Sequence, residues 1–340
     1  MRSTLRRGAV VALGATAALS LGLGSAMADP NYNDNGSVNT NGFLPDSNDL
    51  VGTGSDTIQF VTDAFARGYS SADGVRIASF DAINPATHTS GGPITIRDVN
   101  QDTPLSGSGT PDQVDDDVVI TRPNGSGQGI TTLINNPNVD FARSSRPSNG
   151  STNEDALSFI PFASDGLSYI VDDASFVPND FTAADLRDIY TCQLPGYNAK
   201  LPQSGSGTRA FFLAQISVTE AEIAQAVADG CVDDTVQEHD PSAVDDDPFA
   251  LAPFSEARFR VNPPDPANPP SNTVALAHDD NAAAFYVTRD VFHVVRDSDV
   301  NSAKFQAVFG PSGYICAQMA DGEQGFNSVG IRCGVPNPDV

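Results

Sequence analysis

Basic residues are scarce in this 340-residue chain, where 18 Lys and Arg stand against 43 Asp and Glu. The resulting formal charge of -25 argues against nucleic acid or an anionic membrane as the main partner. Cysteines are also few, since four in a chain of this length cannot form the framework of a disulfide-built miniprotein. The apolar content of 39% excludes a wholly disordered chain, and the length fits one very large domain or two ordinary ones.

Catalytic and metal-binding patterns are missing too. The chain has no Gly-x-Ser-x-Gly elbow, no His-Glu-x-x-His helix and no Ser-x-x-Lys pattern, and its imidazoles are limited to His88, His239, His278 and His293. His293 lies in an apolar run typical of a core or edge histidine, and the two aspartates after His278 are a weak sign of a base or a metal site. The acidic runs at 115–117 and 245–247 lack EF-hand spacing and indicate a solvated surface. We therefore expect no enzyme activity, no cofactor and no metal.

The N-terminus has the pattern of a secretory signal peptide. Arginines at positions 2, 6 and 7 precede an apolar run over 9–23, and Ala-Met-Ala at 26–28 supplies the small-x-small cleavage pattern, so cleavage is predicted after Ala28. The alternative is a membrane anchor, but the run is shorter than the ~20 residues that span a bilayer. No cysteine lies near the cleavage site, so a bacterial lipid anchor is not expected. We expect a secreted, extracellular monomer.

The four cysteines, Cys192, Cys231, Cys316 and Cys333, all lie in the C-terminal half. An even number of cysteines in an exported chain favours disulfides over metal binding or catalysis. Three pairings are possible, and we favour Cys192–Cys231 with Cys316–Cys333 because these join near neighbours in the sequence. A zinc site is the alternative, but the chain has no Cys-x-x-Cys and its histidines are scattered.

Several turns rich in glycine and serine follow predicted strands and precede predicted helices. Strand-like residues at 49–53 lead into a turn at 54–57 and then apolar residues at helical spacing, and the same plan recurs with a strand at 118–121 and a turn at 124–129. A buried strand over 139–147 turns at its end, and 201–208 form another such turn before a helix. The segments 29–48 and 90–114 are polar and are interpreted as a flexible leader and a loop insertion.

Two long apolar runs are long enough to pass from one domain to another. The first covers 158–171, with the crossing placed at 164–166, and the second covers 284–295. Between them, Thr182 and Asp185 resemble a capping box that opens a helix. We predict a signal peptide over 1–28, the leader over 29–48, one discontinuous domain from 49–164 and 286–340, and a second domain over 165–285.

The turns have the chemistry of an anion site. A helix N-terminus exposes unpaired N–H groups and the positive end of the helix dipole, so it stabilises an oxyanion without a cationic side chain. Glycine lets the backbone approach closely, and serine and threonine add hydroxyl donors. The segments 54–57, 125–129, 143–146 and 204–209 share this chemistry, and the prediction depends on their meeting at one point. No Walker lysine follows Gly207, so nucleotide hydrolysis gains no support.

The order of these motifs resembles that in the phosphate-binding proteins of bacterial ABC transporters. The matching segments are Gly-Thr-Gly-Ser-Asp-Thr at 52–57, Gly-Ser-Gly at 125–127, Val-Asp-Phe-Ala-Arg-Ser-Ser-Arg-Pro at 139–147, Pro-Phe-Ala-Ser-Asp-Gly at 161–166 and Ser-Gly-Ser-Gly-Thr-Arg at 204–209. The resemblance covers about 49–310. It implies an α/β, type II periplasmic-binding-protein fold in which a double crossover joins two domains around a ligand cleft.

Carried over to this chain, the resemblance implies a set of ligand-binding residues. These are Ser55, Asp56, Thr57, Ser126, Ser145, Ser206, Gly207 and Thr208. Two positions depart from the family, which usually has an acidic residue at Ser145 and an arginine where Pro202 stands. Arg209 or Arg143 is the candidate to replace the cationic charge, and Asp56 to replace the acidic acceptor of a ligand proton.

The sequence therefore predicts an exported solute-binding protein that captures phosphate or a similar oxyanion and delivers it to an ABC transporter permease. The first alternative is a secreted surface or matrix protein that kept the fold and lost the ligand, which the departures at Ser145 and Pro202 favour. The second is a phosphoester hydrolase built on the same loops.

Overall fold

The computed structural model describes residues 30, 43–69, 71–87, 89–97, 118–260 and 274–336, with the side chain of Asp280 left out. The predicted signal peptide, most of the leader, His88 and the acidic run at 115–117 lie outside the described residues. Among the helices described, none has the length and apolar character needed to span a bilayer.

Most strands belong to one mixed sheet with the order β2-β1-β5-β11-β6-β9-β7-β8, and β10 and β12 also pair with β6. β1 runs parallel to β2 and β5, while β7 runs parallel to β8 and β9. We call the part built on β1, β2 and β5 the β1 half, and the part built on β7, β8 and β9 the β7 half. The strands of this sheet are β1 (Leu50–Gly54), β2 (Ile77–Ser79), β5 (Phe141–Ser144), β6 (Leu157–Asp172), β7 (Asn198–Pro202), β8 (Val232–Val236), β9 (Ala250–Ser255), β10 (Val274–Leu276), β11 (Val287–Arg296) and β12 (Asn327–Ser328).

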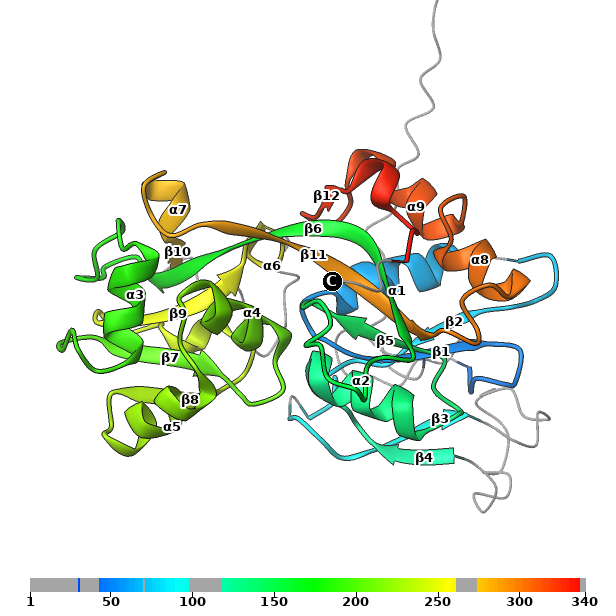
Figure 1. Cartoon of the computed structure of the whole chain (residues 1–340), viewed down its shortest axis with the longest axis horizontal. Helices are drawn as coiled ribbons and strands as arrows, with labels where there is room; N and C mark the ends of the chain where they lie inside the picture. Colours follow the sequence, from blue (N-terminus) through cyan, green and yellow to red (C-terminus); the bar gives the residue numbers. More distant parts are fainter. Residues whose placement is uncertain are drawn as a thin grey trace, which may run out of the picture.

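Two long antiparallel strands, β6 and β11, connect the halves (Figure 1). β11 pairs with β5 in the β1 half, and β6 pairs with β9 in the β7 half. The strand predicted over 158–171 is confirmed by β6. The second predicted strand begins later than expected, at Val287, because the backbone N–H of Ala284 donates to the carbonyl of Asn281 and closes a turn there. The predicted domain boundary at 164 falls within β6, and that at 286 falls just before β11.

Residues 90–97 differ from the predicted loop. They contain β3 (Pro93–Arg97), which pairs antiparallel with β4 (Val118–Thr121) in a separate two-stranded sheet. Burial of Ile94 and Ile96 accounts for this strand, because alternate residues of β3 face the core of the β1 half.

The helices cover both halves, and their ends follow local sequence signals. The predicted capping box at Thr182 and Asp185 is confirmed at the start of α3. The helices are α1 (Gln59–Gly68), α2 (Ser126–Asn135), α3 (Ala183–Tyr190), α4 (Gly207–Gln215), α5 (Glu220–Ala228), α6 (Glu256–Arg260), α7 (Ala277–Asp280), α8 (Ala303–Phe309) and α9 (Tyr314–Gln318), with 3-10 turns at Pro241–Ala243, Met319–Asp321 and Gly330–Arg332.

Each half has its own apolar core. In the β7 half, Tyr169, Tyr190 and Phe212 are buried in one cluster, and in the β1 half Phe65 and Phe141 belong to another. We propose that the domain bounds follow the predicted ones, since the large cluster of the β7 half draws its buried residues from positions 167 to 285.

Both predicted disulfides are present. Cys192, just after α3, bonds Cys231, just after α5, and the Cα atoms are 5.9 Å apart. Cys316 of α9 bonds Cys333 near the C-terminus, with Cα atoms 5.7 Å apart. The zinc alternative for these cysteines is thereby wrong.

Candidate functional site

The site lies where turns from the two halves meet. In parallel sheets the turns after neighbouring strands gather at one edge, so the turns after β1 and β5 lie together, as do those after β7, β8 and β9. The backbone N–H of Gly127, in the first turn of α2, donates to the carbonyl of Gly205, in the turn before α4, at 3.0 Å. The edges of the two halves are therefore in direct contact.

Three serines from three separate segments form one buried cluster. The hydroxyl of Ser55 donates to Oγ of Ser145 at 3.1 Å, and the backbone N–H of Ser145 donates to Oγ of Ser126 at 3.0 Å. Oγ of Ser126 and Oγ of Ser145 are 3.4 Å apart. All three serines are fully buried. The structure thus brings together residues that are up to 90 positions apart in the sequence.

Gly207 presses the first turn of α4 against this cluster. A Cβ atom at Gly207 would lie 2.2 Å from Oγ of Ser126 and 2.4 Å from Oγ of Ser145, so only glycine allows this approach. Ser206 caps α4, because its hydroxyl accepts from the backbone N–H of Arg209. The predicted residues Ser206 and Gly207 therefore lie at the site, with the Ser206 hydroxyl already used as a helix cap.

A second polar group lies around Glu238, which sequence reasoning did not single out. The hydroxyl of Thr57 donates to Oε1 of Glu238 at 3.0 Å, and the backbone N–H of Thr208 donates to the same oxygen at 3.3 Å. The hydroxyl oxygens of Thr57 and Thr208 are 3.4 Å apart. The carboxylate of Glu238 therefore bonds donors from both halves.

Asp56 pairs with His239, the other residue that sequence reasoning missed as a site residue. Oδ1 of Asp56 and Nδ1 of His239 are 2.7 Å apart, and both side chains are buried. Burial raises the pKa of Asp56 to about 7, although the positive charge of Arg258 opposes this shift. Burial lowers the pKa of His239 to about 3, so the imidazole is neutral at neutral pH. Their position in the sequence could have revealed both residues. Glu238 and His239 closely follow β8, and the turns after β7, β8 and β9 lie at the same edge of the sheet.

The two predicted arginines have other partners. The guanidinium of Arg143 donates to the backbone carbonyls of Ser55 and Phe80, at 3.0 and 2.7 Å, and so supports the turn after β1 from behind. The guanidinium of Arg209 is 2.6 Å from a carboxylate oxygen of Glu220 and also donates to Asp234. The structure therefore does not bring the Arg209 side chain into the hydroxyl clusters.

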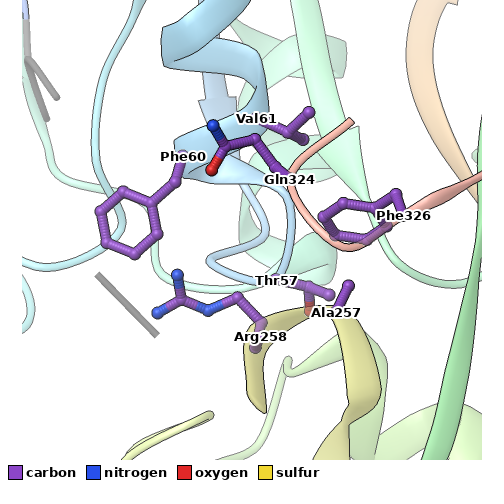
Figure 2. A pocket seen from close by; sticks show the side chains of 7 residues that line it. All are labelled: Thr57, Phe60, Val61, Ala257, Arg258, Gln324 and Phe326. Atoms are coloured by element: carbon purple, nitrogen blue, oxygen red, sulfur yellow. The ribbon is translucent and has the colours of Figure 1, made fainter. Parts of the chain in front are cut away.

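A third arginine, Arg258 of α6, lines a small cavity beside Thr57. The cavity has a volume of about 10 Å³, which is room for roughly one water molecule. In Figure 2, side chains of α1 and α6 face each other across it, and the guanidinium of Arg258 lies 4.1 Å from the centre of the Phe60 ring. Among the described residues, no group accepts a hydrogen bond from the buried Nε of Arg258.

The other described histidines outside this site have structural surroundings. His293 is buried, stacks on Phe162 at 4.3 Å and has Nε2 3.2 Å from the hydroxyl of Thr62, so the prediction of a core histidine is confirmed. His278 stacks on Tyr286 with ring centres 4.1 Å apart.

Comparison with known proteins reveals the fold. No protein-family model matches the chain, and no curated protein sequence matches it. A solved structure assigned as a phosphate ABC transporter substrate-binding protein from Clostridium perfringens, with bound phosphate, is similar at a TM-score of 0.53 and 15% identity, covering 83% of this chain and 100% of that chain. An ABC-type phosphate transport receptor from Vibrio cholerae has a TM-score of 0.45 and 17% identity, covering 75% of this chain and 89% of that chain.

The first of these similarities, together with the two halves joined by β6 and β11, confirms the predicted fold class. At 15% identity the likeness concerns the fold and leaves the ligand to be argued from this chain's own residues. The chain has the α/β, type II periplasmic-binding-protein fold.

Proposed function

We propose that this chain is an exported solute-binding protein that encloses phosphate or a similar tetrahedral oxyanion between its two halves and delivers it to an ABC transporter permease. The observation that carries the proposal is the contact of Gly207 with Ser126 and Ser145. It places the N-terminal turn of α4, from the β7 half, against a hydroxyl cluster of the β1 half. Closure of the halves then surrounds a ligand with donors from both sides.

The donors suit an oxyanion although the whole chain is acidic. Serine and threonine hydroxyls and the first amides of α2 and α4 are neutral groups that act at short range. Distant surface carboxylates are screened by physiological salt beyond roughly 8 Å. We therefore expect the affinity to depend only weakly on salt, in contrast to a site built from surface cations.

Calorimetry tests the proposal directly. Purified exported protein is titrated with phosphate, arsenate and sulfate in separate experiments. Binding of at least one of these anions at one site per chain is expected, and absence of heat for all three contradicts oxyanion capture. Size-exclusion chromatography checks the expected monomer, and N-terminal sequencing of the exported protein checks cleavage after Ala28.

One observation favours the runner-up, a secreted surface or matrix protein that kept the fold without the ligand. The carboxylate of Glu238 already accepts from Thr57 and from the backbone of Thr208, so this protein's own anion occupies donors that a ligand would need. Flat titrations with all three anions, together with a cooperative thermal unfolding transition, would decide for this alternative.

A further inference from the structure

Three buried side chains with metal-binding chemistry meet across the contact between the halves. Asp56 follows β1, whereas Glu238 and His239 follow β8, so the ligands come from both halves. One potential ligand atom from each residue lies within 4.8 Å of the other two. Nδ1 of His239 is 2.7 Å from Oδ1 of Asp56 and 4.0 Å from Oε1 of Glu238. Small movements would bring these atoms to the spacing of ligands around one ion.

A second observation is independent of this spacing. Oε2 of Glu238 is buried and has no hydrogen-bond partner among the described residues, and the Glu238 side chain has no exposed surface. A buried carboxylate oxygen without a partner is costly, because it has lost water and gained no donor. A cation beside Glu238 would remove that cost.

We propose that Asp56, Glu238 and His239 form a binding site for a divalent transition-metal ion of the Zn²⁺ class that links the β1 half to the β7 half. One imidazole nitrogen and two carboxylates suit Zn²⁺ and its neighbours, whereas Mg²⁺ and Ca²⁺ prefer oxygen ligands alone. The site does not depend on the proposed oxyanion function. A bound dication would also offset the two buried carboxylates that face the hydroxyl donors.

The charges around the cluster are compatible with this ion. The cluster holds two buried carboxylates and one buried imidazole, and a bound dication would favour the ionised form of both carboxylates. Arg143 and Arg289 also lie near Asp56, but Arg143 is held by backbone carbonyls, and Arg289 pairs with Asp165 at 2.9 Å. Arg258 opposes the dication most, since it exerts the largest charge effect on Asp56.

The test is calorimetry of the untagged, chelator-treated exported chain with ZnCl₂ in a buffer free of phosphate, with MgCl₂ and CaCl₂ as comparisons. We expect one Zn²⁺ per chain and much weaker binding of the other two ions. His239→Gln and Glu238→Gln should each lower Zn²⁺ affinity at least about tenfold, because each removes a ligand. The matched control is His278→Gln, another histidine beside an acidic residue, which should leave the affinity unchanged. Arg258→Gln should raise the affinity several-fold, because it removes a repelling charge.

Absence of Zn²⁺ binding, or equal affinity in wild type, His239→Gln and Glu238→Gln, would overturn the proposal. Should either variant fail to fold, the wild-type protein is titrated with Co²⁺ instead. We expect the visible absorption of cobalt bound by nitrogen and oxygen ligands, saturating at one ion per chain. Absence of this spectrum would count against the site. Titration of the same chelator-treated protein with phosphate is a separate experiment. Absence of Zn²⁺ binding and absence of phosphate binding are therefore distinguishable.

Discussion

A methyl group at Gly207 should hold the two halves of the molecule apart. In the structure the added Cβ atom would lie 2.2 Å from Oγ of Ser126 and 2.4 Å from Oγ of Ser145, well inside contact distance. Either hydroxyl could rotate away only by giving up its hydrogen bonds to the other serine. Cβ of Ser126 would still lie at 3.1 Å, so rotation alone does not make room.

The cost follows from these contacts. Overpacking of this kind typically costs about 1–3 kcal/mol. Since 1.4 kcal/mol corresponds to a tenfold change in a binding constant, Gly207→Ala should weaken phosphate binding roughly 5-fold to 150-fold. Alanine is the better helix former by up to about 1 kcal/mol, so the β7 half alone should not be destabilised. The expected signature is therefore weaker binding without a lower unfolding temperature.

Two measurements check this prediction. Calorimetry gives the phosphate affinity, and small-angle X-ray scattering gives the radius of gyration of the ligand-free protein, which should increase in Gly207→Ala. Gly127→Ala is the matched control, because its Cβ atom would meet no atom closer than 3.3 Å and the effect should be smaller. Unchanged affinity and unchanged radius in Gly207→Ala would refute the argument that this contact closes the site.

Three further predictions concern stability and binding. Burial lowers the pKa of His293 to about 3, so between pH 6.5 and 3 only the unfolded chain gains this proton, and the free energy of unfolding decreases as the pH is lowered. His293→Phe should reduce the slope of unfolding free energy against pH, measured by urea denaturation, by up to about 1.4 kcal/mol per pH unit. An identical slope in the variant would contradict this. Replacing Cys316 and Cys333 together by serine should cost about 3 kcal/mol of unfolding free energy, by the same assay. Thr208→Val should weaken phosphate binding about 2-fold to 13-fold through loss of a hydroxyl donor, and unchanged calorimetry would remove Thr208 from the site.

The parts that sequence predicted well depend on local patterns. The Gly-Ser turns, the capping box at Thr182 and the long strand β6 can each be recognised from a short stretch of sequence. The fold was predicted because the order of these motifs resembles that in phosphate-binding proteins. Pairing of near neighbours was enough for the disulfides. The start of β11 was placed too early, because Ala284 and Phe285 are buried just after a turn and are not part of a strand.

The parts that sequence missed depend on contacts between distant segments. Glu238 and His239 gain their importance only when the turn after β8 meets the turn after β1, and they bond residues 181 and 183 positions away. Arg209 was expected near a ligand, but Glu220 and Asp234 hold its side chain elsewhere, and an acidic chain offers too many carboxylates for that choice to be predicted. The strand β3 was also missed because it depends on a distant segment: its partner β4 follows a long polar stretch of the sequence.

Neither covalent cross-link joins the β1 half to the β7 half. Cys192–Cys231 fastens α3 to the start of β8, and Cys316–Cys333 fastens α9 to the C-terminal segment. Each disulfide can therefore form once its own half has folded, whether or not the other half has folded. Apart from the connecting strands β6 and β11, the two halves are held together by noncovalent contacts, so neither disulfide would prevent them from separating.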